Sequence, residues 1–81
     1  MNAQEIITPF LNNVFDEAVL AGSTKAVLTA TVVRSLRVAV GVEYFDILVH
    51  QLEASGKVKW LGKLEMIDNN TPVIEITDYV S

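Results

Sequence analysis

The chain has 81 residues, a net charge of -4, a hydrophobic fraction of 51% and no cysteine. A single domain of this size buries only about 60–65% of the surface of its unfolded chain, so we expect exposed apolar surface and, most simply, a homodimer. The acidic balance opposes generic binding to nucleic acid or anionic membranes, and the lack of cysteine excludes disulfides and thiolate sites. Neither a signal peptide nor a membrane span is recognisable, so we expect a cytoplasmic protein without membrane contact.

The charges are distributed unevenly along the chain. Both ends are acidic, whereas all six basic residues lie between them, at Lys25, Arg34, Arg37, Lys57, Lys59 and Lys63. The overall acidity can therefore hide a local basic patch.

The first expected element is a helix over about residues 3–21. Thr8 can cap a helix and Pro9 suits a first turn, after which apolar residues follow at helical spacing. Asn2, with Glu5 three residues later, is an alternative cap. In that case the helix starts earlier and bends at Pro9.

The next segment combines two signals, because its many valines and threonines favour a strand whereas its apolar spacing permits a helix. We interpret it as a short strand over residues 25–28, a cap at Thr29 and a helix over residues 30–38. In that helix the expected inward side chains are Val33 and Leu36, and the expected outward ones are Arg34 and Arg37.

A third helix is expected over residues 42–54, after Gly41. Its apolar stripe consists of Phe45, Leu48, Val49 and Leu52. Ser55 and Gly56 are expected to cap its C-terminus, because glycine adopts the left-handed conformation without a steric penalty.

After the third helix, apolar and polar residues alternate, which predicts a hairpin with strands over residues 57–67 and 73–80. Matching the two buried faces requires paired residue numbers with an even sum, and hence a loop of about three or five residues. The expected cross-strand pairs are Met66 with Ile74 and Leu64 with Ile76.

The stretch "LVHQLEASGKVKW" resembles the end of the recognition helix and the first wing strand of the winged helix-turn-helix family. The resemblance extends over residues 9–80. It implies an α+β fold in which three helices precede a C-terminal β-hairpin wing. It also implies that the helix over residues 42–54 enters the DNA major groove while the hairpin tip contacts the DNA backbone.

The outward side of this helix carries the candidate recognition residues, which are Glu43, Tyr44, Asp46, Ile47, His50 and Gln51. None is an arginine or lysine, although specific contacts to guanine come chiefly from these two residue types. Glu43 and Asp46 would be repelled by phosphates unless each accepted a hydrogen bond from a cytosine amino group. Tyr44, His50 and Gln51 could still contact base edges.

Basic residues next to the helix are the candidate phosphate contacts, and they are Arg34, Arg37, Lys57, Lys59 and Lys63. They would position a duplex and make its binding sensitive to salt. Alternatively, the lysines keep the outer face of an edge hairpin soluble.

A catalytic or metal-binding role has less support in the sequence than a binding role. Glu43, Asp46, His50 and Glu53 share one helix face and could form a metal or acid-base site, but a solvated helix face has the same pattern. Since the chain has one histidine and no glycine-rich phosphate loop, we assign no catalytic residue, metal or cofactor and expect no enzyme. Trp60 is expected in the core, or otherwise as an interface anchor.

Two functions follow from these features. The electrostatics of the third helix favour a regulatory module that acts through protein-protein interaction or oligomerisation. The family resemblance favours the alternative, a dimeric transcriptional regulator that binds double-stranded DNA.

Overall fold

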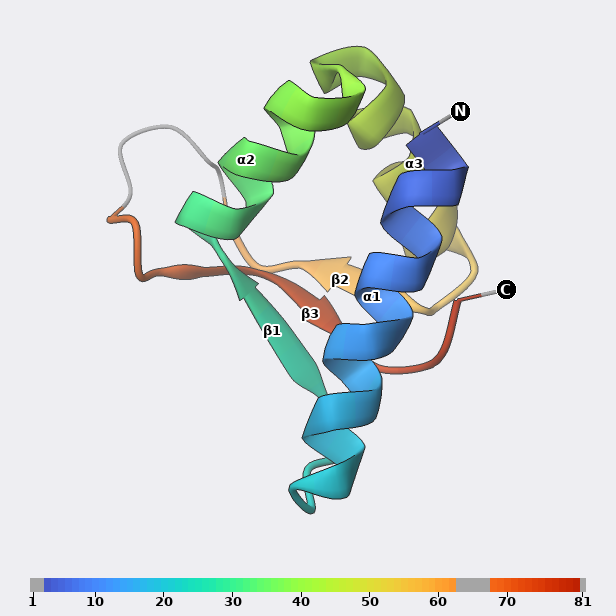
Figure 1. Cartoon of the computed structure of the whole chain (residues 1–81), viewed down its shortest axis with the longest axis vertical. Helices are drawn as coiled ribbons and strands as arrows, with labels where there is room; N and C mark the ends of the chain where they lie inside the picture. The colour runs from blue at the N-terminus through green and yellow to red at the C-terminus, as the bar shows by residue number, and fades with distance from the viewer. Residues whose placement is uncertain (1–2, 63–67, 81) are drawn as a thin grey trace.

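The computed structural model describes residues 3–62 and 68–80 (Figure 1). Its elements in chain order are α1 (Ala3–Leu20), β1 (Ala26–Thr29), α2 (Ala30–Val40), α3 (Val42–Ala54), β2 (Val58–Trp60) and β3 (Pro72–Ile76). The described chain is therefore α+β, with three helices and one small antiparallel sheet. This layout is compatible with a winged helix.

The sheet has the strand order β1-β3-β2, so the last strand in sequence lies in the middle. Two isoleucines of β3 each pair with one residue of β1 and one residue of β2. Ile74 lies opposite Leu28 and Trp60, and Ile76 lies opposite Ala26 and Val58. All strand neighbours are antiparallel. In this register one face of the sheet carries the buried apolar side chains of Ala26, Leu28, Val58, Ile74 and Ile76.

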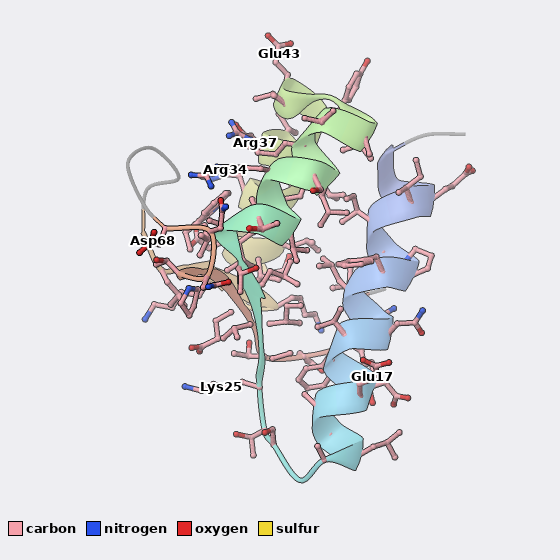
Figure 2. The ribbon with its side chains drawn as sticks, turned by 60° about the vertical axis from the view of Figure 1, so that its left-hand side comes forward. Glu17, Lys25, Arg34, Arg37, Glu43 and Asp68 are labelled. Atoms are coloured by element: carbon pink, nitrogen blue, oxygen red, sulfur yellow. The ribbon has the colours of Figure 1, made fainter. Side chains whose placement is uncertain are left out.

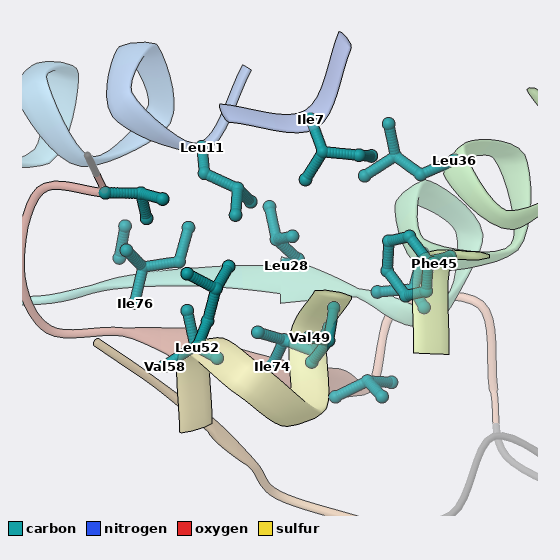
Figure 3. Packing of buried hydrophobic residues seen from close by; sticks show 14 of the residues in the cluster. Ile7, Leu11, Leu28, Leu36, Phe45, Val49, Leu52, Val58, Ile74 and Ile76 are labelled. Carbon is teal, nitrogen blue, oxygen red and sulfur yellow. The ribbon is translucent and has the colours of Figure 1, made fainter. Parts of the chain in front are cut away.

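The core lies between this face of the sheet and the three helices, as Figure 3 shows. The predicted inward residues Val33, Leu36, Phe45, Val49, Leu52, Ile74 and Ile76 are all buried. Leu48 is only partly buried and packs against the edge of the core. The helical and alternating apolar patterns therefore identified the buried faces correctly.

α1 starts before Thr8, which confirms the alternative start and contradicts the cap at Thr8. Pro9 lies inside the helix, where it removes one backbone hydrogen bond. The helix nevertheless continues on both sides because Ile7, Leu11 and Phe15, spaced by four, are all buried in the core. Tertiary burial thus outweighs the local cost of proline.

The start of α2 differs in detail from the prediction. Thr29 occupies the cap position, but its side chain makes no capping hydrogen bond. Instead, the N–H groups of Ala30 and Thr31 donate to the backbone carbonyls of Thr71 (2.9 Å) and Asn69 (3.1 Å). The segment before β3 therefore provides the acceptors that a side-chain cap usually supplies.

The register predicted for the hairpin is wrong. Ile74 pairs with Trp60 and Ile76 with Val58, whereas Met66 and Leu64 were expected opposite these isoleucines. The paired numbers still have an even sum, but alternation alone fits either register. The structure favours the observed register because the carbonyls of Asn69 and Thr71 accept hydrogen bonds from the first N–H groups of α2, which holds the end of the connection between β2 and β3 (residues 61–71) against α2. Within it, residues 63–67, and with them Leu64 and Met66, lie outside the described part.

Candidate functional site

The exposed face of α3 borders an open groove of about 620 Å³. The groove is lined by Asp46, Ile47, His50, Gln51 and Trp60. The structure thus brings together four of the six predicted recognition residues and adds the last residue of β2. Tyr44 and Glu43 are exposed on the same helix but do not line the groove.

The orientation of α3 follows from its buried stripe. Phe45, Val49 and Leu52 face the core, so residues on the opposite side of the helix face outward, and Ile47 keeps 58% of its surface exposed. Gly41 sets the start of the helix: its φ of 96° is a conformation that favours glycine, and it separates α2 from α3 by a single residue.

Trp60 belongs to both the core and the groove. Its indole ring makes an edge contact with the buried ring of Phe45, with 6.5 Å between the centroids. It is nevertheless only partly buried, and it lines the groove. The primary expectation of a core residue is therefore only partly correct. No sequence signal indicated this partial exposure, because the alternation places Trp60 within an expected strand over residues 57–67, whereas β2 ends at Trp60.

Asp46 is held by an ion pair with α2. The distance from Arg37 Nη2 to Asp46 Oδ2 is 3.0 Å, and the Arg37 side chain is only 23% exposed. Arg37 therefore does not point freely outward as predicted, because a carboxylate of the next helix draws it in. The other carboxylate oxygen, Asp46 Oδ1, is buried and has no hydrogen-bond partner among residues 3–62 and 68–80, and the same holds for Arg37 Nε.

Other candidate phosphate contacts also have partners within the chain. Lys57 Nζ lies 3.1 Å from Asp78 Oδ2, and Arg34 Nη1 donates to Asn69 Oδ1 at 2.7 Å. Figure 2 shows Arg34 and Arg37 projecting from the same side of α2. Lys59 is exposed on the outer face of the sheet, opposite Glu75 in the strand register. The remaining candidate, Lys63, lies outside the described residues.

The metal or acid-base alternative is not supported by the geometry. Asp46 is paired with Arg37, and Glu53 Oε2 accepts a hydrogen bond from the backbone N–H of Trp60 at 3.0 Å. Within residues 3–62 and 68–80, no three histidine, aspartate or glutamate residues are grouped so that they could hold a metal ion. Helical spacing on one face did not reveal that two of these carboxylates have other partners.

Comparison of the chain with protein-family models, curated proteins and solved structures found no match. None of the helices in the described part combines the length and hydrophobicity needed to cross a membrane.

Proposed function

We propose that the chain is a small winged-helix module that binds a protein partner through the exposed face of α3 and thereby acts in regulation. The observation that carries this proposal is the groove, in which Ile47 and Trp60 present apolar surface beside the polar groups of His50 and Gln51. An aromatic and an aliphatic side chain bordered by polar groups are typical of a protein-binding hot spot.

The charges near the groove support a protein partner rather than a duplex. α3 contains Glu43, Asp46 and Glu53 and no lysine or arginine. Two candidate phosphate contacts, Arg37 and Lys57, already bind carboxylates, so a phosphate would have to displace these partners. We expect the partner to place cations near the exposed carboxylate of Glu43.

The interface can be tested with Ile47→Asp, which places a charge in the groove. Tagged protein expressed in its own cells should lose its co-purifying partner by this substitution, as quantified by mass spectrometry. Leu20→Asp is the matched control, because Leu20 is 81% exposed at the end of α1 that lies far from α3 (Figure 1). Equal capture by wild type and both folded variants would contradict an interface at α3.

DNA binding is tested separately by titrating random and genomic duplexes at two salt concentrations. We expect no specific complex at either concentration. Salt-sensitive binding that weakens in the double variant Lys57→Glu and Lys59→Glu would instead support the DNA-binding alternative, because it would show that these cations contact phosphates.

A further inference from the structure

β2 forms one edge of the sheet in the described part of the chain. Thr77 N–H donates to the Lys57 carbonyl at 2.9 Å, and Leu61 N–H donates to the Val73 carbonyl at 2.7 Å. Hydrogen bonding alternates along an antiparallel strand. The backbone N–H and C=O groups of the intervening residues Val58 and Trp60 therefore point away from β3, toward the open edge.

Glu53 occupies part of this edge. Its Oε2 accepts the hydrogen bond from the Trp60 N–H at 3.0 Å. A side-chain carboxylate from α3 thus takes the position in which the carbonyl of a neighbouring strand would accept the same bond. Open strand edges invite pairing with other chains, and a charged side chain placed along the edge prevents pairing that is not specific.

We propose that β2 binds an extended segment of the partner protein as an additional strand. In the free protein, the Glu53 carboxylate accepts the Trp60 N–H hydrogen bond that a carbonyl of this strand would accept. This inference rests on the proposed protein-binding function of the α3 face. Because Trp60 ends β2 and also lines the groove, side chains of the added strand on that face lie next to the groove.

The side chains of β2 define the chemistry of the segment. On its other side, β2 pairs with Ile74, Glu75 and Ile76, which lie opposite Trp60, Lys59 and Val58. A strand added at the open edge faces the same three side chains of β2, so it requires an apolar, an acidic and an apolar residue in succession. Residues beyond this strand that reach α3 meet its carboxylates, where cations are favoured.

A second copy of β2 fits this edge poorly. Twofold antiparallel pairing centred on Lys59 sets the two Lys59 side chains opposite each other, and pairing centred on Val58 sets Lys57 opposite Lys59. Like charges directly opposite each other destabilise a sheet. The net charge of -4 adds repulsion between copies. The occupant is therefore a segment of a different protein.

The test uses the full chain and a peptide that carries the sequence of residues 72–77 (PVIEIT) between glycine-serine flanks. Binding is followed by the fluorescence of Trp60, which is the single tryptophan, and by the amide NMR shifts of Val58 and Trp60. One control peptide carries lysine in place of the glutamate. A second has N-methyl groups on both isoleucine nitrogens, which removes the donors that would face β2.

We expect the parent peptide to shift both amides and both control peptides to bind at least about tenfold more weakly. Glu53→Ala should tighten binding about tenfold, because one competing hydrogen bond to a charged group is removed. Glu53→Gln, which retains an acceptor oxygen, should have a smaller effect. Lys59→Glu should reverse the preference between the glutamate and lysine peptides.

Two results would overturn strand addition: equal binding of the N-methylated peptide, or no binding of any peptide to a folded Glu53→Ala variant. If Ile47→Asp still abolishes partner capture in either case, the partner binds at the α3 face but does not add a strand to β2. If capture is also insensitive to Ile47→Asp, the proposed function itself fails.

Discussion

Asn12 joins the C-terminal segment to α1 with both ends of its side-chain amide. Its Nδ2 donates to the carbonyl of Val80 at 2.7 Å, and its Oδ1 accepts from the N–H of Val80 at 2.6 Å. The side chain of Val80 is buried against the core at this point. One polar residue on a helix therefore satisfies the backbone of a segment that no strand pairs.

Asn12→Ala should lower the free energy of unfolding by roughly 1–3 kcal/mol, because it leaves both backbone groups of Val80 without these partners. Asn13→Ala is the matched control, since Asn13 is exposed. Its effect should stay within about 0.5 kcal/mol. Chemical denaturation measures both variants, and equal stability of the two would show that the Asn12 amide contributes little.

The carboxylate of Asp78 makes the stability of the fold depend on pH in the acidic range. The Lys57 ammonium and the Tyr79 N–H both donate to its carboxylate, and these hydrogen bonds lower the pKa of Asp78 below 3.8. Since the carboxylate is favoured in the folded state, the stabilisation is present above pH 3.8 and is lost as the pH falls through the lower folded value.

Asp78→Asn should therefore have a lower Tm than wild type near neutral pH, and the difference should shrink as the pH falls well below 3.8. Thermal unfolding followed by circular dichroism across this range measures the trend. A difference in Tm that stays constant with pH would contradict a contribution from the ionised carboxylate.

At alkaline pH, Tyr79 makes stability depend on pH in the opposite direction. The hydroxyl of Tyr79 donates to Asp16 Oδ1 at 2.8 Å, and this hydrogen bond raises the pKa of Tyr79 above 10.0. Its contribution to stability is complete below pH 10.0 and is lost as the pH rises through the folded value. The rings of Tyr79 and Phe15 also make an edge contact, with 4.8 Å between their centroids.

At the scale of elements, the candidate site depends on the turn between α3 and β2. Gly56 has a φ of 77°, and the N–H of Lys57 donates to the carbonyl of Leu52 at 2.9 Å across the turn. These features form a Schellman-type C-cap. The turn places Trp60 at the groove and within hydrogen-bonding distance of Glu53.

Gly56→Ala should destabilise the fold by roughly 1–2 kcal/mol, because a side chain in the left-handed region strains the backbone even where space is open. Gly62→Ala is the control, since Gly62 has no positive φ and equally open surroundings. It should be neutral to within about 0.5 kcal/mol. Denaturant unfolding compares the two, and an equal loss in both would remove the conformational explanation.

At the scale of the whole molecule, large apolar side chains are left on the surface. Val38 is 84% exposed, Leu20 81% and Tyr44 70%. Such exposure in a chain of 81 residues favours association. Lys59 of β2 and Lys57 just before it make this edge an unfavourable contact between copies, so a dimer would use another surface.

We therefore predict a homodimer in sedimentation equilibrium. Val38→Asp should weaken association, because Val38, Val42 and Tyr44 are all exposed at the corner between α2 and α3, whereas Leu20→Asp should leave association unchanged. A substitution at the contact should raise the dimer dissociation constant about tenfold or more. A strict monomer at the highest soluble concentration would contradict the prediction.

Local patterns in the sequence were sufficient for the helices and for the buried faces. The spacing of Phe45, Val49 and Leu52 placed α3 correctly, and Gly56 marked its end, because helical periodicity and a left-handed cap are properties of short segments. The same spacing identified the outward residues that line most of the groove.

Contacts between distant segments were decided only by the tertiary structure. The register that pairs Trp60 with Ile74 depends on how the segment before β3 meets α2, since the apolar alternation fits several registers equally well. Likewise, the ion pair of Arg37 with Asp46 and the bond from Trp60 to Glu53 join different elements. Sequence alone thus determined which face of α3 is exposed. Packing decided which charges of α3 are already bound and which strands lie at the edges of the sheet, because both depend on how separate elements meet.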